Sequence, residues 1–256
     1  MMLEQKVKIT SHQKIAPQVF LMSFASPQMA AQARPGQFVH LKPSGPGPLL
    51  LRRPFSINRV KGGYLFIMYR VVGRGTSLIS SLPKGAEMDV LGPLGKGFEI
   101  SRKYKEHVIL AGGMGLAPMQ FLADRLRTMK LESRLFYGCA GKKEMLPCPA
   151  PGKIIATDDG SCGYRGFVTD AFLSRIDKFK KPVVYACGPW PMLKRTALIC
   201  HQHHIDCQVS LEAFMACGVG ACQGCVVRGV KEYVTVCRQG PVFDSREIDW
   251  EQESGL

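Results

Sequence analysis

Four cysteines near the C-terminal end of the chain are spaced as the ligands of an iron–sulfur cluster. Cys217 and Cys222 are separated by four residues, Cys222 and Cys225 by two, and Cys237 follows after eleven more. This is the plant-type spacing of proteins that bind a 2Fe-2S cluster through four thiolates. The segment is therefore predicted to wrap around such a cluster.

The glycines among these cysteines favour the same interpretation. Gly218, Gly220 and Gly224 adopt positive φ at little cost and let backbone N–H groups approach the sulfurs. A structural zinc site is the simplest alternative, but zinc usually takes two Cys-x2-Cys pairs and only one is present. A disulfide framework is less favoured still, because a chain of this length does not need such cross-links.

Length and composition indicate a globular protein with one large or two small domains. The chain has 256 residues, of which 46% are hydrophobic and 21% charged. It contains no apolar run long enough to cross a bilayer, and its first residues lack the apolar core of a signal peptide. We therefore expect a cytoplasmic protein whose ten cysteines stay reduced.

The net charge of +14 indicates an anionic partner, such as the phosphates of a cofactor or an acidic protein face. The basic residues are scattered in short clusters, and no basic run or aromatic-interleaved patch appears. Nucleic-acid binding is therefore not expected.

Residues 1–101 are predicted to form short β-strands closed into a small antiparallel barrel. The clearest strands are residues 37–41 and 64–69, and residues 43–48 form a loop between strands. Arg53-Pro54-Phe55-Ser56 follows that loop and would suit a flavin, although an exposed barrel edge can have the same sequence.

A second segment supports the flavin interpretation. Arg70 and Arg74 flank a turn at Gly75-Thr76 that leads into a short helix, for which Thr76 or Ser77 is the predicted N-cap. Backbone N–H groups at the start of a helix bind a pyrophosphate well. Together the two segments favour a bound anionic cofactor over a plain basic surface.

Residues 102–212 alternate between predicted strands and helices, as in a doubly wound parallel sheet. The first strand, residues 108–111, runs into Gly112-Gly113-Met114-Gly115 and then a helix in which Pro118 suits the N1 position. A second loop, Cys187-Gly188-Pro189, ends a later strand at the same edge. The two loops predict a nucleotide crevice, and nearby Lys142 and Lys143 leave open whether NAD or NADP binds there.

Other candidates give weaker signals. His201, His203 and His204 end a predicted helix, where a solvated helix end is favoured over a metal site because no further ligand completes it. A lone Cys187 is either a pocket wall or a small buried residue. No nucleophile–base pair and no pair of carboxylates has a spacing that predicts acid–base catalysis, so we name no catalytic residue.

Taken in order, the motifs RPFS, GT, GGMGLAP and CGPWPM resemble the ferredoxin–NADP reductase superfamily. The C-terminal stretch, LEAFMACGVGACQGCVV with VCRQGPVFDSREIDW, is similar to the electron-transfer subunits of NAD-dependent (class 1B) dihydroorotate dehydrogenases. A related family, the small subunits of NADH-dependent ferredoxin:NADP oxidoreductases, is expected to carry an aspartate at one of the four cysteine positions. The presence of four cysteines favours the dihydroorotate family.

The resemblance implies three parts: a flavin-binding β-barrel at 1–101, an NAD-binding α/β domain at 102–212 and a 2Fe-2S segment at 213–256. FAD would be held by Arg53, Pro54, Phe55, Ser56, Met68, Tyr69, Arg70, Gly75 and Thr76. The cluster would be held by Cys217, Cys222, Cys225 and Cys237. NAD would be held by Gly113, Gly115, Cys187 and Gly188. The superfamily commonly has Tyr where Phe55 stands, so the ring is kept and the phenol lost.

The resemblance further implies a relay in pyrimidine (UMP) biosynthesis. An FMN-containing catalytic partner would oxidise dihydroorotate, and electrons would pass through the 2Fe-2S cluster and FAD of this chain to NAD+. The assembly would be a heterotetramer with two copies of each chain. Two alternatives stay open: a reductase subunit serving a ferredoxin, sulfide or glutamate-synthase-like partner, and a zinc-stabilised interaction module without enzyme activity.

Overall fold

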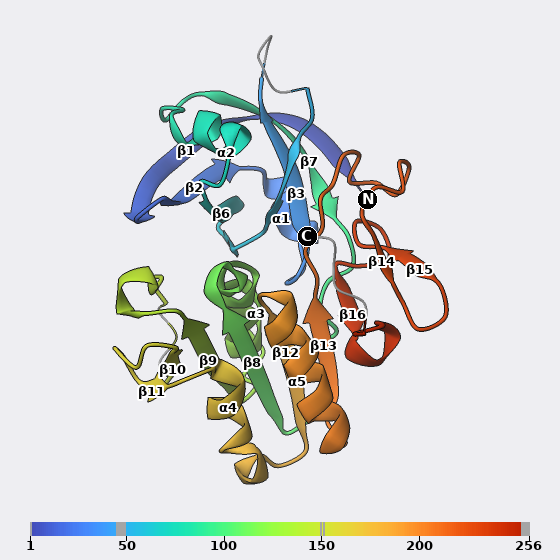
Figure 1. The fold of residues 1–256 in the computed structure, drawn as a ribbon. Helices are drawn as coiled ribbons and strands as arrows, with labels where there is room; N and C mark the ends of the chain where they lie inside the picture. Colours follow the sequence, from blue (N-terminus) through green and yellow to red (C-terminus); the bar gives the residue numbers. More distant parts are fainter. Residues whose placement is uncertain (1, 45–49, 149, 151, 252–256) are drawn as a thin grey trace.

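The computed structural model describes residues 2–44, 50–148, 150 and 152–251. An antiparallel sheet forms one end of the molecule and a parallel α/β sheet the other, and the C-terminal segment lies beside both (Figure 1). Most of the loop predicted at 43–48, and the last residues of the predicted cluster segment, fall outside the described residues. Within the described residues, no helix is long and apolar enough to cross a membrane.

The antiparallel sheet has seven strands in the order β4-β3-β7-β1-β2-β6-β5, with two short helices. Its elements are β1 (Leu3–Ala16), β2 (Val19–Ala25), α1 (Pro27–Gln32), β3 (Phe38–Pro43), β4 (Arg53–Ser56), β5 (Arg59–Lys61), β6 (Tyr64–Arg70), α2 (Arg74–Ser80) and β7 (Glu87–Leu94). The predicted strands at 37–41 and 64–69 correspond to β3 and β6.

The long strand β1 explains why this sheet curls. Its first half, Leu3 to Lys8, pairs with β7, and its second half, Ile9 to Ala16, pairs with β2. A register shift between Ile9 and Ser11 lies where the pairing with β2 begins, and bulges of this kind increase strand twist. The barrel is a half-barrel rather than the closed form expected, because its ladder ends at β4 and β5.

The second sheet has the order β11-β10-β9-β8-β12-β13-β16, and all of its strands except β16 are parallel. The chain moves outward from β8 in one direction and returns to add β12 and β13 on the other side, which confirms the doubly wound prediction. Its elements are β8 (Glu106–Gly112), η1 (Gly113–Gly115), α3 (Leu116–Thr128), β9 (Ser133–Cys139), η2 (Lys142–Glu144), β10 (Ile154–Thr157), β11 (Tyr164–Arg165), α4 (Val168–Leu173), η3 (Ile176–Lys178), β12 (Pro182–Cys187), α5 (Trp190–Gln202) and β13 (Asp206–Ser210).

Alternation along the central strands separates two cores. Ile109 of β8 and Tyr137 of β9 pack with α3 on one face, while Val108 and Phe136 pack with α4 and α5 on the other. Helix α3 begins at Leu116, so Pro118 is its third residue and not N1 as predicted. The short 3-10 turn η1 leads directly into the helix, which therefore begins two residues before Pro118. Sequence periodicity does not reveal this turn.

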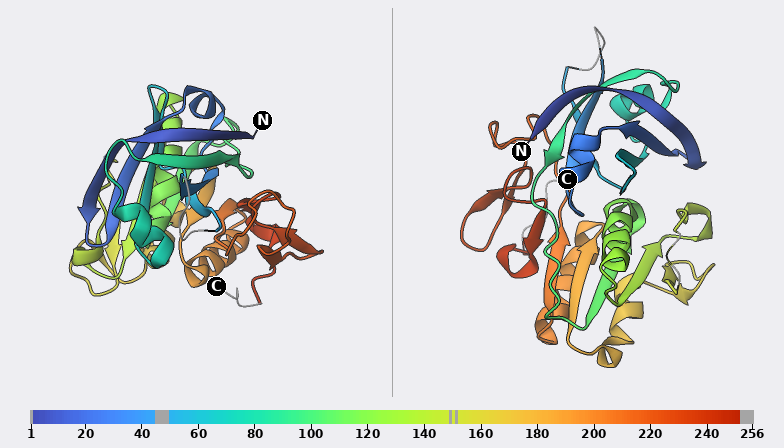
Figure 2. Two further views of the ribbon diagram at one scale, coloured as in Figure 1. Left: turned by 90° about the horizontal axis from the view of Figure 1, so that it is seen from above. Right: turned by 180° about the vertical axis from the view of Figure 1, so that it is seen from behind.

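The C-terminal segment contains β14 (Val226–Arg228), β15 (Tyr233–Thr235), β16 (Val242–Asp244) and the 3-10 turn η4 (Ser245–Glu247). Strands β14 and β15 form a hairpin, and β16 adds an antiparallel strand to the edge of the parallel sheet beside β13. The same core that holds α4 and α5 includes Cys225, Val236 and Cys237. The segment is thus fastened to the nucleotide sheet and lies on one side of the molecule, as both views of Figure 2 show.

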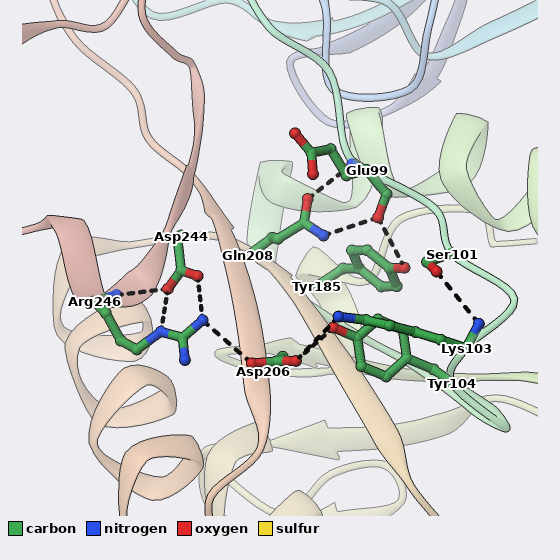
Figure 3. A network of polar contacts seen from close by, with 9 residues as sticks. All are labelled: Glu99, Ser101, Lys103, Tyr104, Tyr185, Asp206, Gln208, Asp244 and Arg246. Atoms are coloured by element: carbon green, nitrogen blue, oxygen red, sulfur yellow. Dashed lines mark hydrogen bonds and ion pairs between the residues drawn. The ribbon is translucent and has the colours of Figure 1, made fainter.

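A polar network ties the segment and the linker before β8 to the same strand (Figure 3). The Tyr104 hydroxyl donates to Asp206 Oδ2 at 2.5 Å, and the Arg246 guanidinium lies 3.2 Å from Asp206 Oδ1. Gln208 exchanges two hydrogen bonds of 2.8 and 2.9 Å with the backbone of Glu99. Because β13 carries both contacts, it fixes the linker and the C-terminal segment relative to each other.

Candidate functional site

A pocket of about 270 Å³ lies where the half-barrel, the parallel sheet and the C-terminal segment meet, and we call it the central pocket. Eight of the residues predicted to bind cofactors line it: Pro54, Phe55, Ser56, Met68, Tyr69, Arg70, Thr76 and Cys187. Its other walls come from Phe38, Val72, Met114, Ala117, Ser210, Leu211, Glu212, Ala213, Met215 and Pro241. Motifs far apart in the sequence therefore meet at one site.

Two aromatic rings form the barrel wall of the central pocket. Phe55 of β4 and Tyr69 of β6 lie edge to face, with ring centroids 5.4 Å apart. The Tyr69 hydroxyl is 2.8 Å from Nε2 of His12, whose Nδ1 is 2.9 Å from the Leu82 carbonyl oxygen. The carbonyl requires a proton on Nδ1, so the Tyr69 hydroxyl donates to Nε2. Burial also raises the pKa of Tyr69, and the phenol stays neutral.

Arg53 and Gly75, the two remaining members of the predicted flavin set, lie against each other. A Cβ on Gly75 would stand 2.5 Å from Arg53 Nε, so glycine here lets the guanidinium lie against the first turn of α2. That helix begins at Arg74 with Gly73 as its N-cap, which corrects the prediction of Thr76 or Ser77. The Thr76 hydroxyl instead accepts from the backbone N–H groups of Val72 and Gly73 at 2.9 and 3.2 Å.

The sheet wall of the central pocket holds a thiol and a carboxyl. Burial, and then the nearby Glu212 carboxylate, raise the pKa of the Cys187 thiol, which also bonds to the Ser210 hydroxyl. The surrounding protein desolvates Glu212 and raises its pKa, although its side chain is open to the solvent in the pocket. Sequence reasoning missed Glu212. Its position just after β13, at the carboxyl edge of a parallel sheet, is a signal that would have found it.

A second pocket, of about 450 Å³, lies at the carboxyl edge of the parallel sheet, and we call it the sheet-edge pocket. It lies where the strand order reverses between β8 and β12, the usual ligand position in such sheets. Its lining comprises Arg70, Gly112, Gly113, Gly138, Cys139, Ala140, Glu144, Asp158, Phe167, Val168, Thr169, Pro189, Pro191, Met192 and Arg195.

The predicted NAD-binding residues divide between lining and packing roles. Gly113 lines the sheet-edge pocket at φ +52°, while Cys187 lines the central pocket instead. Gly115 and Gly188 line neither pocket. A Cβ on Gly115 would collide with the Cys187 carbonyl oxygen, and one on Gly188 would stand 3.0 Å from the Gly112 nitrogen. These two glycines let the two loops approach each other.

Charged side chains of both signs face the sheet-edge pocket. Glu144 and Asp158 come from the turns that follow β9 and β10, and burial together with these two carboxylates raises the pKa of Cys139 between them. Arg195 is paired with Asp170 at 2.6 Å. Lys142 and Lys143, which precede Glu144, are exposed and do not line this pocket. The turn that the sequence singled out thus contributes Glu144 to this pocket, and the choice between NAD and NADP stays open.

Backbone N–H groups converge on the sulfurs of the cysteine loop, residues 215–225, and of Cys237. Cys217 Sγ accepts from the amides of Val219 and Cys222 at 3.4 Å, and Cys237 Sγ accepts from Gly220 at 3.1 Å. Further amide contacts of 3.5 and 3.4 Å reach the sulfurs of Cys222 and Cys225. Such N–H···S contacts favour thiolates and suit the negatively charged sulfurs of a bound cluster.

The four cysteines fall into two pairs. The Cys222 thiol donates a hydrogen bond to the Cys217 sulfur, and the Cys237 thiol donates one to the Cys225 sulfur. Desolvation would raise the pKa of Cys217, but the amides of Val219 and Cys222 outweigh it and lower this pKa to about 6. Burial and the Cys225 contact raise the pKa of Cys237 to about 12, with a further effect from Cys217. The quartet is therefore one electrostatic unit, and all four thiols are free.

This paired arrangement fits two irons better than one zinc ion. Among the described residues, no group of three or more His, Cys, Asp or Glu side chains is placed to hold a single metal ion. A two-iron cluster shares four thiolates between its irons, whereas a structural zinc needs four ligands around one point. His201, His203 and His204 are exposed at the end of α5, in line with the predicted solvated helix end.

The backbone of the cysteine loop differs in one respect from the expectation. Gly218 and Gly220 have φ of +71° and +82°, as predicted, but Gly224 does not have positive φ and Gln223 does, at +57°. The Gln223 side chain donates to the Gly220 carbonyl at 2.9 Å, which supports this turn. At this turn the left-handed conformation is thus adopted by Gln223, with its side-chain contact, and not by the neighbouring Gly224.

His40 of β3 lies against this loop and was not found from the sequence. A Cβ on Gly218 would stand 2.7 Å from both Cε1 and Nε2 of the His40 ring. The ring is 1% exposed, and its Nε2 has no hydrogen-bond partner among the described residues. Burial, with a smaller effect of Arg52, lowers the pKa of His40 to about 4.

Comparisons with known proteins agree with this geometry. A family model described as the iron–sulfur cluster binding domain of dihydroorotate dehydrogenase B matches residues 212–249. The chain is 36% identical to the dihydroorotate dehydrogenase B (NAD(+)) electron transfer subunit of Desulforamulus reducens, over 95% of this chain and 97% of that one. The subunit of the same name from Listeria innocua is 37% identical, over 96% and 99%.

Solved structures give the same architecture. An NADH-dependent reduced ferredoxin-NADP oxidoreductase, described for flavin-based electron bifurcation, superposes with a TM-score of 0.86 at 30% identity, covering 96% of this chain and 90% of that one. A ferredoxin NADP+ reductase from Neisseria gonorrhoeae with bound FAD and NADP shares the fold, with a TM-score of 0.65 at 17% identity over 78% and 91%. The chain belongs to the family of electron transfer subunits of dihydroorotate dehydrogenase B (NAD(+)).

Proposed function

We propose that this chain carries electrons between a catalytic partner and NAD+ in a dihydroorotate dehydrogenase of pyrimidine (UMP) biosynthesis. The family supports this assignment, since relatives with that name match this chain over nearly their whole length. When bound, the 2Fe-2S cluster supplies one-electron transfer, and FAD supplies the exchange between single electrons and a hydride. The dihydroorotate site lies on the partner chain.

One observation carries the proposal: the cysteine loop begins in the wall of the central pocket. Glu212, Ala213 and Met215 line that pocket, and Cys217 follows two residues later. A cluster on the quartet therefore lies beside whatever occupies the central pocket. That adjacency is the requirement for passing electrons within one chain.

The central pocket fits the flavin of FAD. Phe55 and Tyr69 offer ring faces and edges, and Arg53 sits at the first turn of α2 for a phosphate. Arg70 also supports a bound anion, because it lines the central pocket and its Nε is buried without a partner among the described residues. Pro54, Ser56, Met68, Gly75 and Thr76 complete the proposed set.

The residues near the reacting face bind and orient rather than exchange protons. Because its pKa is raised, the Cys187 thiol stays protonated at neutral pH and fills the sheet wall as an uncharged group. Phe167, which is 61% exposed, offers a ring at the sheet-edge pocket for the flat parts of a dinucleotide. Gly113 leaves backbone open to NAD there, and Gly115 and Gly188 keep the two loops close enough to form the pocket.

The catalytic partner is proposed to dock on the C-terminal segment. Its exposed apolar side chains include Phe214 at 76%, Val230 at 65% and Tyr233 at 63% exposure. Exposed apolar groups of this size gather at protein–protein contacts. The partner would contain FMN and form a heterotetramer with two copies of each chain. Docked on this segment, it would deliver electrons close to the exposed Cys222.

We also propose the division into a flavin domain at 1–101, an NAD domain at 102–212 and a cluster segment at 213–256. A core whose buried residues all come from residues 1–101, apart from Phe121, supports the first boundary. The start of the matched iron–sulfur domain at residue 212 supports the second. The ten free thiols suit a reducing compartment such as the cytoplasm.

Co-purification tests the assignment. Expression with an FMN-containing dihydroorotate dehydrogenase chain should give a brown-yellow complex that reduces NAD+ with dihydroorotate. Cys222→Ser should lose the cluster absorbance and this coupled turnover, yet keep NADH-to-dye activity at the flavin. Cys162→Ser, a cysteine outside the quartet, should keep both activities. Full coupled turnover in Cys222→Ser would contradict the proposal.

A second candidate is a reductase subunit with a different partner, because a reduced ferredoxin-NADP oxidoreductase is 30% identical over most of the chain. The same preparation distinguishes the two. Binding only to a glutamate-synthase-like flavoprotein, with no dihydroorotate-dependent reduction of NAD+, would favour the second candidate. A colourless protein that contains zinc would instead exclude both.

A further inference from the structure

His40 has a position that the relay described above does not explain. Strand β3 alternates: Val39 and Leu41 point into the half-barrel core, whereas Phe38 belongs to the other core, which also includes Cys225 and Cys237. His40 lies two residues after Phe38, on that same side, and the two rings are 5.7 Å apart. The imidazole is therefore directed from the flavin half of the molecule toward the cysteine quartet.

Close packing against the loop backbone fixes the ring there. Gly218, the residue after Cys217, approaches the imidazole so closely that any side chain at this position would collide with it. Positive φ at Gly218 is part of the same turn, so the loop is shaped to receive this ring. The ring belongs to the barrel and the turn to the cluster segment, which makes the contact a link between the two.

The ring nitrogen at this contact needs a hydrogen-bond partner. Nε2 is fully buried and has no partner among the described residues. A buried donor without a partner costs the free energy of its lost hydrogen bonds to water, because no bond within the protein replaces them. A neutral imidazole carries its proton on the nitrogen that faces an acceptor. The negatively charged sulfurs of a cluster at Cys217 are the acceptors that this side of the ring can meet.

We propose that His40 is a positioning residue for the iron–sulfur cluster, with its Nε2–H directed at the cluster on the Cys217 side. Hydrogen bonds to cluster sulfurs stabilise the more negative, reduced state and raise the reduction potential. The inference rests on the cluster of the proposed function, but not on the identity of the partner or substrate.

The test compares three variants of the complete flavin- and cluster-loaded complex by redox titration followed with electron paramagnetic resonance. His40→Leu removes the donor and should lower the ratio of reduced to oxidised cluster at a fixed potential about tenfold, which is about 59 mV for one electron. His40→Gln keeps an N–H donor and should stay nearer to the wild type.

His107→Leu is the matched control, because His107 is also fully buried with an unpartnered Nε2 but stacks on Tyr185 inside the nucleotide sheet. It should leave the cluster potential unchanged. Loss of cluster from His40→Leu but not from His40→Gln would also support the donor role. Equal potentials in His40→Leu and wild type, an equal shift in His107→Leu, or cluster loss from both His40 variants would overturn it. Absence of a cluster signal from the wild type would instead refute the proposed function.

Discussion

The central pocket and the sheet-edge pocket are built in different ways, although Arg70 lines both. The central pocket takes its walls from the half-barrel, the parallel sheet and the C-terminal segment. The sheet-edge pocket takes nearly all of its walls from the strand ends, turns and helices of the parallel sheet, and Arg70 is its one contribution from the half-barrel. The first therefore exists only when three parts of the chain assemble, while the second is mostly local.

The two pockets also differ in charge. The central pocket has two ionisable side chains of opposite sign, Arg70 and Glu212, beside a neutral thiol, which suits a group that stays bound. The sheet-edge pocket is wider and carries Glu144, Asp158 and Arg195, which suits a charged ligand that enters and leaves. A resident cofactor in the first pocket and a diffusing substrate in the second would account for this difference.

Arg70→Ala should have the largest effect, because it removes the one cation common to both pockets. Hydrogen bonds to charged groups contribute about 1.5–3 kcal/mol each, so we expect losses of about 10- to 100-fold in both FAD retention and NADH affinity. Flavin release on dilution and the KM for NADH measure the two. Lys61→Ala, at an exposed cation of β5 that lines neither pocket, should change neither. Loss of only one property would show that Arg70 serves a single pocket.

Exchange of the acidic groups of the sheet-edge pocket should affect that pocket alone. Glu144 and Asp158 would repel the 2′-phosphate of NADP, so Glu144→Gln with Asp158→Asn should raise the preference for NADPH over NADH about tenfold. Steady-state kinetics with both nucleotides checks this. Asp159→Asn is the control, since Asp159 bonds to Ser161 and does not line the pocket. A similar shift in the control would mean that general charge, not position, sets the preference.

Glu212 allows a smaller test of the central pocket through pH. Its folded-state pKa is raised by desolvation, so the folded protein binds this proton more tightly than the unfolded chain does. Its contribution to stability is therefore lost as pH rises through the folded pKa. Glu212→Gln should match the wild type near pH 4 and be more heat-stable at pH 8, as followed by flavin release on heating.

Glu99→Gln provides the baseline for that comparison. Glu99 is an exposed carboxylate outside the pocket, with 74% of its side chain accessible. This variant controls for the exchange of a carboxyl for an amide outside the pocket. A stability gain for Glu212→Gln that is the same at every pH would indicate better packing, and would remove the titration argument.

The sequence was most informative where structure is periodic or ligands are close in the chain. Apolar runs and helical spacing located β8, α3 and most other elements of the doubly wound sheet, because the central strands β8, β9 and β12 are largely buried. The cysteine spacing identified the quartet because three of its members lie within nine residues of one another. Local pattern was sufficient in both cases.

Residues that meet only through the tertiary fold were not found. His12 fixes the Tyr69 hydroxyl from 57 positions away, and His40 reaches the cysteine loop from another sheet. No prediction from the sequence concerned Glu212, which the fold places in the wall of the central pocket. The closed barrel and the N-cap at Thr76 failed for a similar reason, since the register of β1 and the hydrogen bonds of Thr76 depend on contacts that composition does not encode.

Asp206→Asn should have the smallest effect and leaves both pockets intact. Asp206 begins β13, at the end of the sheet opposite the two pockets, and accepts from Tyr104 and Arg246 while 38% of its side chain is exposed. Exposed ion pairs contribute only about 0.2–1 kcal/mol, and salt screens them. We expect a drop in heat stability that shrinks at high salt, with FAD retention and the KM for NADH unchanged. A change in flavin retention alone would mean that loosening the C-terminal segment at this far end also disturbs the central pocket. Only the central pocket, and not the sheet-edge pocket, uses that segment as a wall.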